Sequence, residues 1–192
     1  MTAPTVVVVP GLRGDAPTHW QEVYAARTPG TVTVPFPAVD HWHDLPARTD
    51  LIEGTVAAVD GPVILLAHSA GVLAAVHWAR SPRSSVGAVV GAVFATPPDF
   101  DVDWPEPHPR PAELAAQGWS PIPRARLPFP SVLAASRNDP LARYRTTAGL
   151  AEVWGSRLVD LGEVGHLNPA SGFGEWPLAA ELIAEMTLQR TS

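Results

Sequence analysis

Cysteine is absent from the 192 residues, and so is lysine, so that all 13 basic residues are arginine. The absence of cysteine excludes disulfides, cysteine-ligated zinc and thiol nucleophiles. With 19 acidic residues the net charge is −6, and no basic stripe is available to neutralise phosphates. We therefore expect no nucleic-acid partner and no binding to anionic membranes.

A long hydrophobic run is missing from the N-terminal segment. Only the four residues Val6–Val9 form an apolar run before Pro10, and no basic residue precedes them. Such a run is too short for a signal peptide or a bilayer-spanning helix, so we expect a cytoplasmic protein. No linker or charge run divides the sequence, and residues 1–192 are predicted to form a single domain.

Strand and helix patterns alternate along the chain. Apolar, β-branched runs predict six strands, at residues 5–9, 31–34, 62–67, 87–95, 131–136 and 156–161. Helical patterns lie between and after them, from about 18–27, 44–59, 71–80, 140–154 and 175–188. Buried strands separated by helices are typical of an α/β fold. We predict a three-layer α/β/α sandwich with a mostly parallel sheet of about six strands.

Residues 96–130 interrupt this alternation. The segment contains ten prolines, which prevent a long regular element, and only a short helix near 112–117 is expected in it. It follows the fourth predicted strand, and we expect it to form an irregular loop.

The sequence AHSAG places Ser69 directly between a buried strand and a helix. This junction is the context of a nucleophile elbow, a sharp turn that requires small residues two positions before and after the serine. Ala67 and Gly71 occupy those positions, although glycine is more usual at the first. The turn would also leave the N–H of Ala70 free at the helix start. The alternative is an ordinary serine that caps the helix.

A serine nucleophile needs a histidine base and an acid at the same edge of the sheet. His166 follows the strand 156–161, and Asp139 follows the strand 131–136. As alternatives, His166 is a surface loop residue and Asp139 caps a helix. The order serine, aspartate, histidine along the chain favours a catalytic triad.

The chain resembles the α/β-hydrolases, and most closely the small serine hydrolases similar to retinoblastoma-binding protein 9, so the resemblance implies a compact fold with no large cap domain. The matching motifs are VVVVPGLRGDAPTHWQ, AHSAG, SRNDP and GHLNPASGFGEWP. The resemblance implies that Ser69 is the nucleophile, His166 the base and Asp139 the residue that orients His166. It also implies an oxyanion hole made by the backbone N–H groups of Leu12 and Ala70. Where many relatives have a histidine before the glycine of this loop, the present chain has Pro10.

Other polar clusters are weaker candidates. The sequence DHWHD, residues 40–44, contains two histidines and two aspartates, but no further ligand motif accompanies it, so no metal site is expected. Asp99, Asp101 and Asp103 follow the fourth predicted strand and offer alternative acids to Asp139. His19 and His68 are interpreted as structural residues, and the sequence contains no motif that calls for a cofactor.

Seven tryptophans are many for this length. Trp42, Trp104 and Trp119 fall in predicted loops, and we expect them to line a substrate pocket, with loop anchoring as the alternative. The predicted function is serine hydrolysis of carboxylic esters, with thioesters or amides as related substrates. The alternative is a protein-binding module that retains the hydrolase fold.

Overall fold

Six parallel strands form one sheet in the computed structural model, which describes residues 2–12, 17–38, 41–82 and 84–189. The strand order is β2-β1-β3-β4-β5-β6, and every neighbouring pair is parallel. The strands are β1 (Thr5–Val9), β2 (Val32–Thr33), β3 (Val63–His68), β4 (Val89–Ala95), β5 (Ser131–Ala135) and β6 (Arg157–Asp160). The predicted parallel sheet is confirmed, and its edge strand β2 is shorter than expected.

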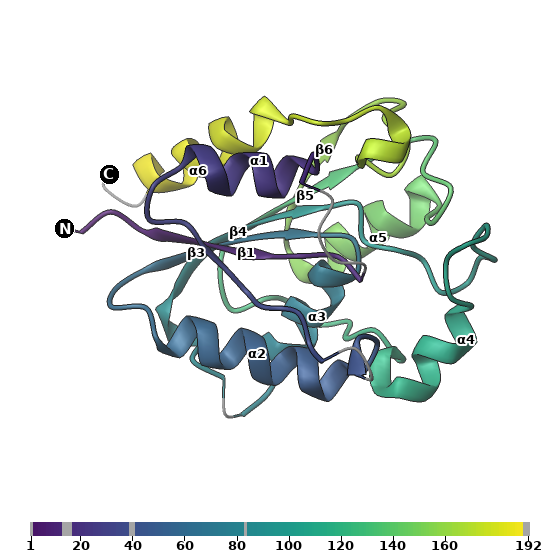
Figure 1. Cartoon of the computed structure of the whole chain (residues 1–192), viewed down its shortest axis with the longest axis horizontal. Helices are drawn as coiled ribbons and strands as arrows, with labels where there is room; N and C mark the ends of the chain where they lie inside the picture. The colour runs from purple at the N-terminus through teal and green to yellow at the C-terminus, as the bar shows by residue number, and fades with distance from the viewer. Residues whose placement is uncertain (1, 13–16, 39–40, 83, 190–192) are drawn as a thin grey trace.

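Helices cover both faces of the sheet, which confirms the three layers (Figure 1). The helices α1 (Trp20–Arg27) and α6 (Pro177–Gln189) pack on one face. The opposite face is covered by α2 (Leu45–Ala57), α3 (Ala70–Ala79) and α5 (Tyr144–Trp154). The segment 96–130 contains only the one-turn helix α4 (Pro111–Leu114) and an irregular turn, Ala115–Trp119, so it forms no large cap domain.

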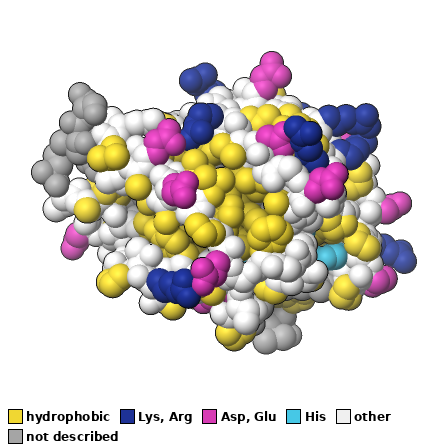
Figure 2. Space-filling model, turned by 90° about the horizontal axis from the view of Figure 1, so that it is seen from above, with side chains coloured by type: hydrophobic (Ala, Val, Ile, Leu, Met, Phe, Trp, Pro, Cys, Tyr) yellow, Lys and Arg dark blue, Asp and Glu magenta, His cyan; other side chains and the backbone are white. Residues whose placement is uncertain are grey.

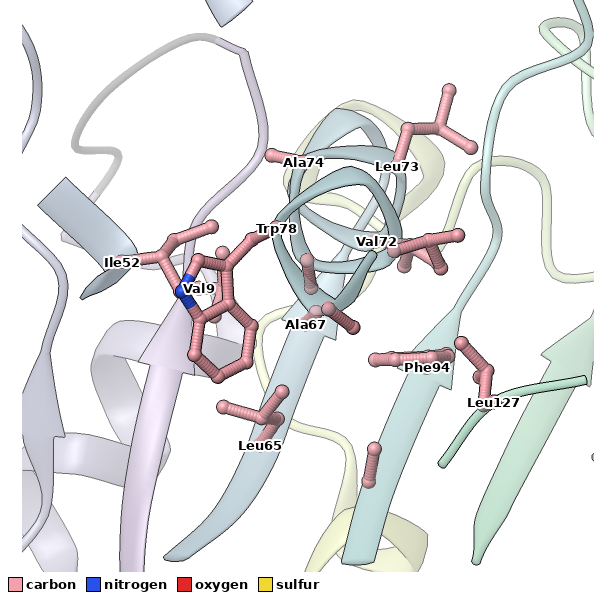
Figure 3. Packing of buried hydrophobic residues seen from close by; sticks show 14 of the residues in the cluster. Val9, Ile52, Leu65, Ala67, Val72, Leu73, Ala74, Trp78, Phe94 and Leu127 are labelled. Carbon is pink, nitrogen blue, oxygen red and sulfur yellow. The ribbon is translucent and has the colours of Figure 1, made fainter. Parts of the chain in front are cut away.

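The core consists of two apolar layers, one on each side of the sheet. The layer beneath α2, α3 and α5 includes Trp78, whose ring lies near Val9 and Ile52 in Figure 3. The strands β3 and β4 are buried on both faces, which explains their continuous apolar sequences. Each large side chain buried here contributes about 1.5–3 kcal/mol to folding.

The face formed by α1 and α6 has an apolar centre, which Figure 2 shows from above. A groove between the two helices is lined mainly by Val23, Tyr24, Trp176, Pro177 and Ala180. An ion pair of 2.7 Å between Arg27 and Glu175 joins the two sides of this groove. The ion pair is exposed, so its net stabilising effect is small.

Several helices begin later than the sequence pattern predicted, and the structure shows the reason for two of them. The first begins at Trp20 because His19 has the extended backbone of a cap and accepts a hydrogen bond from the N–H of Gln21 at 3.2 Å. The helix predicted from residue 140 begins at Tyr144. Before this helix, the Asp139 carboxylate accepts a hydrogen bond from the N–H of Leu141 at 2.8 Å, which forms a separate turn.

Candidate active site

Ser69 occupies a strained turn at the carboxyl end of β3. Its φ is 55° and its ψ is −130°, a backbone conformation that is unfavourable for a residue with a side chain. The turn is held by the hydrogen bond from the Ser69 N–H to the carbonyl of Ala95 at 2.9 Å. Strand β3 ends at His68 and α3 begins at Ala70, so the strand-turn-helix arrangement predicted for this stretch is present.

Three side chains from distant parts of the sequence form a continuous chain of hydrogen bonds. Ser69 Oγ lies 2.8 Å from His166 Nε2. His166 Nδ1 donates to both carboxylate oxygens of Asp139, at 3.0 and 2.9 Å. The side chains of His166 and Asp139 are 5% and 2% exposed, so water does not compete for this bond. In this arrangement the Asp139 carboxylate sets the tautomer of the imidazole, whose Nε2 can accept the serine proton.

The loops that carry Asp139 and His166 are bonded to each other. The Asn138 side chain accepts the N–H of Gly165 at 2.7 Å and the hydroxyl of Ser136 at 3.0 Å. The His166 N–H donates to Ser171 Oγ at 3.1 Å, and Ser171 in turn is held by Asn168. These bonds restrict the loops, and therefore the distance between carboxylate and imidazole, before substrate binds.

His68 and Trp20 hold the His166 loop from the other side. His68 Nε2 donates to the carbonyl of His166 at 2.9 Å, and Trp20 Nε1 donates to the carbonyl of Leu167 at 2.9 Å. Leu167 has a φ of 49°, so the backbone after His166 is strained as well. The interpretation of His68 as a structural residue is consistent with this contact, although His68 also borders the cavity at Ser69.

Three imidazole rings lie in a row beside Ser69. The ring centroids of His19 and His68 are 4.8 Å apart, and those of His68 and His166 are 5.0 Å apart. Burial, together with the charge that His166 can carry, lowers the pKa of His19 to about 4. The same two causes, with His19 in addition, lower the pKa of His68 well below its usual value. Both rings are therefore neutral at physiological pH.

The low pKa of His68 predicts a loss of stability in acid. The unfolded chain binds a proton at His68 below about pH 6.5 and the folded protein does not, so the free energy of unfolding falls as pH drops from about 7 to about 5. We expect His68→Gln, which keeps a neutral donor, to weaken this dependence in urea unfolding at the two pH values, while His19, whose pKa is also lowered, contributes the part that remains.

A wild-type protein that is equally stable at pH 7 and pH 5 would contradict this prediction.

A cavity of about 270 Å³ opens beside Ser69. It lies at the carboxyl ends of the parallel strands, where open α/β sheets bind ligands. Its lining includes Pro10, Gly11, Leu12, His19, Gln21, Glu22, Phe36, His68, Ser69, His108, His166, Asn168, Pro169 and Ala170. Leu12, predicted as an oxyanion donor, is among these residues, and Ala70 is the first residue of α3.

Phe36, His108 and the segment 168–170 line the cavity although no sequence pattern was used to predict them there. Their positions after β2, β4 and β6 could have indicated them, because segments that follow parallel strands meet at one edge.

The three tryptophans expected in the pocket lie elsewhere. Trp119 is fully buried beneath α2, and its Nε1 donates to the carbonyl of His43 at 2.6 Å. Trp104 Nε1 donates to the carbonyl of Asp99 at 2.9 Å, and the Trp42 ring packs on His43. None of the three belongs to the residues that line the cavity. The bonds of Trp104 and Trp119 to loop carbonyls show that these two side chains anchor loops, which was the alternative.

The alternative acids and the histidine-rich stretch are not arranged around Ser69. The Asp99 carboxylate pairs with Arg143 at 2.8 Å, and this hydrogen bond holds the pKa of Asp99 below its usual value despite burial. Asp40 lies outside the described residues. Among the residues that the structure describes, no three His, Asp or Glu side chains gather in a way that would hold a metal ion. No helix in the described ranges has the length and apolarity needed to cross a membrane.

A sequence model of the family described as serine hydrolase matches residues 6–185. The chain belongs to the serine hydrolase family. A comparison with curated proteins gives no significant match.

Solved structures of other hydrolases share this fold. A YdeN-like hydrolase from Pectobacterium atrosepticum is 29% identical, with a TM-score of 0.76, and the match covers 96% of this chain and 91% of that protein. The ydeN gene product of B. subtilis is 16% identical with a TM-score of 0.71, covering 95% and 98%. The type II thioesterase BorB from the borrelidin biosynthetic cluster is 19% identical with a TM-score of 0.64, covering 97% and 93%. This serine hydrolase therefore has the fold of the α/β-hydrolases.

Proposed function

We propose that the protein hydrolyses carboxylic esters through an acyl-enzyme on Ser69. The observation that carries this proposal is the hydrogen-bonded chain from Ser69 through His166 to Asp139. The serine lies at the mouth of a cavity, and both partners are buried and held by their loops. An ester is a substrate class that this chemistry serves readily, because its alkoxide is a better leaving group than the nitrogen of an amide.

The proton moves twice in each half of the reaction. Ser69 Oγ forms a bond to the acyl carbon as His166 Nε2 takes its proton. The carbon–oxygen bond to the alcohol then breaks, and the alcohol leaves with that proton. Water next attacks the acyl carbon, giving one proton to His166, and the carboxylic acid leaves as Ser69 regains its proton. Asp139 stays ionised throughout and stabilises the imidazolium.

The negative charge that forms on the carbonyl oxygen requires nearby donors. Ala70 is the first residue of α3, where the backbone N–H has no partner within the helix. Leu12 lies in the loop after β1 and lines the cavity. We assign the backbone N–H groups of these two residues to the oxyanion hole. Each such donor is worth about 10²–10³-fold in rate.

The test is covalent labelling by a fluorophosphonate, a probe that reacts with activated serines. We expect the wild-type protein to be labelled at Ser69, as located by peptide mass spectrometry. His166→Ala should react far more slowly, because the hydroxyl then lacks its base.

Heat-denatured protein serves as the control for non-specific reaction. A folded wild-type protein that resists the probe and hydrolyses no ester would contradict the proposed function and support the protein-binding alternative.

A further inference from the structure

Arg48 is a buried cation that contacts the loop after β1. It lies in α2 on the same face as Leu45 and Ile52, so its side chain points into the apolar core. Only 5% of the residue is exposed. Its Nη2 donates to the carbonyl of Pro10 at 2.7 Å and to the carbonyl of Gly11 at 2.9 Å. The guanidinium thus joins α2 to the loop that carries Leu12.

No carboxylate offsets the charge of Arg48 within the described part of the chain. The ion pairs found there do not include it, and its Nε and Nη1 are buried without a hydrogen-bond partner. The rings of Phe36 and Trp119 lie 5.8 and 6.0 Å from Cζ and supply weak cation–π attraction. Burial lowers the pKa of Arg48 to about 10, so it is still charged at neutral pH.

A buried charge is unfavourable for folding unless it is paired, and Arg48 has no counter-ion among the residues that the structure describes. An apolar side chain would fit the surroundings of α2 better, because the neighbouring core positions hold leucine and isoleucine. The presence of arginine here therefore favours a functional reason, and the loop carbonyls are the polar atoms that it contacts.

We infer that Arg48 is a positioning residue that strengthens the oxyanion hole. The carbonyl that accepts its second hydrogen bond belongs to the peptide group between Gly11 and Leu12, and the N–H of the same peptide group is the proposed oxyanion donor. A charged donor on the carbonyl polarises the peptide and makes its N–H a stronger donor. The role of Arg48 presupposes the ester hydrolysis proposed above.

The stronger Leu12 N–H stabilises the transition state more than it stabilises the bound substrate. The substrate carbonyl is neutral, whereas the tetrahedral intermediate carries a full negative charge on oxygen. A stronger and correctly oriented Leu12 N–H therefore lowers the activation barrier more than it improves binding. Loss of Arg48 should reduce kcat and leave KM nearly unchanged.

The test compares Arg48→Met, which has no charge, with Arg48→Lys, which keeps one. For Arg48→Met we expect kcat to fall by about 10–100-fold with KM within about threefold of wild type. Affinity for a trifluoromethyl ketone, which forms an oxyanion adduct with Ser69, should fall by the same factor as kcat. Arg48→Lys should recover part of both losses, because the charge remains while the double hydrogen bond is lost.

Ile52→Ala is the matched control on the same helix. It removes a buried side chain without touching the loop, so it should lower Tm while the folded enzyme keeps kcat within about twofold. If Arg48→Met does not fold, Arg48→Gln, which keeps a donor but no charge, replaces it in the comparison with the same expected loss.

Two results would overturn this role for Arg48. The first is a folded, neutral variant at position 48 with the kcat of the wild type. The second is a loss confined to KM. If the wild-type enzyme hydrolyses esters, either result leaves the proposed function intact. A wild-type protein without any ester hydrolysis overturns both proposals, and this is seen before the variants are compared.

Discussion

Replacement of Ser69 with alanine is expected to lower kcat for ester hydrolysis by roughly 10³–10⁶-fold. The variant lacks the oxygen that we propose forms the acyl-enzyme, while the proposed oxyanion donors and the cavity remain. His166→Ala should produce a loss of similar size, and the double variant should be little worse than either single one, because the two residues act as a unit. Steady-state hydrolysis of an activated ester measures kcat for the two single variants and the double variant.

Ser84→Ala is the matched control for the serine replacement. The Ser84 hydroxyl donates to the carbonyl of Ser81 at 2.8 Å, and Ser84 is outside the residues that line the cavity. This variant should keep the wild-type rate. A Ser69→Ala protein that is folded and as active as wild type would contradict the assignment of the nucleophile.

Replacement of Gly71 with alanine is expected to destabilise the protein by more than about 2 kcal/mol and to abolish most activity. A Cβ at this position would lie 2.5 Å from the carbonyl oxygen of Pro10 and would also overlap the carbonyl oxygen of Val9. Both are backbone atoms at the end of a buried strand, so they cannot turn away as a side chain would. Helix α3 must shift instead, and Ser69 shifts with it.

Gly54→Ala provides the comparison for the glycine replacement. Gly54 lies within α2, and a Cβ there has no neighbour within 4 Å. This change should stabilise the helix by about 0.5–1 kcal/mol, because alanine loses less backbone entropy on folding. Urea unfolding distinguishes the two variants. Equal free energies of unfolding would show that the backbone around Gly71 can accommodate a Cβ.

The residues of the hydrogen-bonded chain were identifiable from local patterns. Ser69 follows an apolar strand and stands between small residues, and Asp139 and His166 each follow another strand of the same parallel sheet. In such a sheet the segments after the strands emerge at one edge, so proximity in space follows from position along each βα unit. The distances of 2.8–3.0 Å among these side chains agree with that reasoning.

The tryptophans show where local patterns were insufficient. Trp104 and Trp119 stand in a proline-rich segment that has no periodicity, so nothing in the sequence distinguishes a side chain that faces a cavity from one that faces the core. Trp119 is buried because the proline-rich segment crosses α2 and α3. Its indole N–H donates a hydrogen bond to the carbonyl of His43, 76 residues away. The start of α5 was misplaced for a related reason, since the Asp139 carboxylate forms a turn of its own before the helix.

The parallel sheet and the turn at Ser69 could be predicted from the sequence. They depend on hydrophobic periodicity and on small residues near the serine, which are properties of residues close together in the chain. The packing of non-adjacent segments decided the lining of the cavity and the burial of Arg48 against the loop after β1. Arg48 interrupts an apolar helix face in the sequence, but its partners are backbone carbonyls 37 and 38 residues away. Every residue carries a backbone carbonyl, so no pattern of side chains could have identified Pro10 and Gly11 as the partners of Arg48. Only the folded chain brings the guanidinium next to this loop.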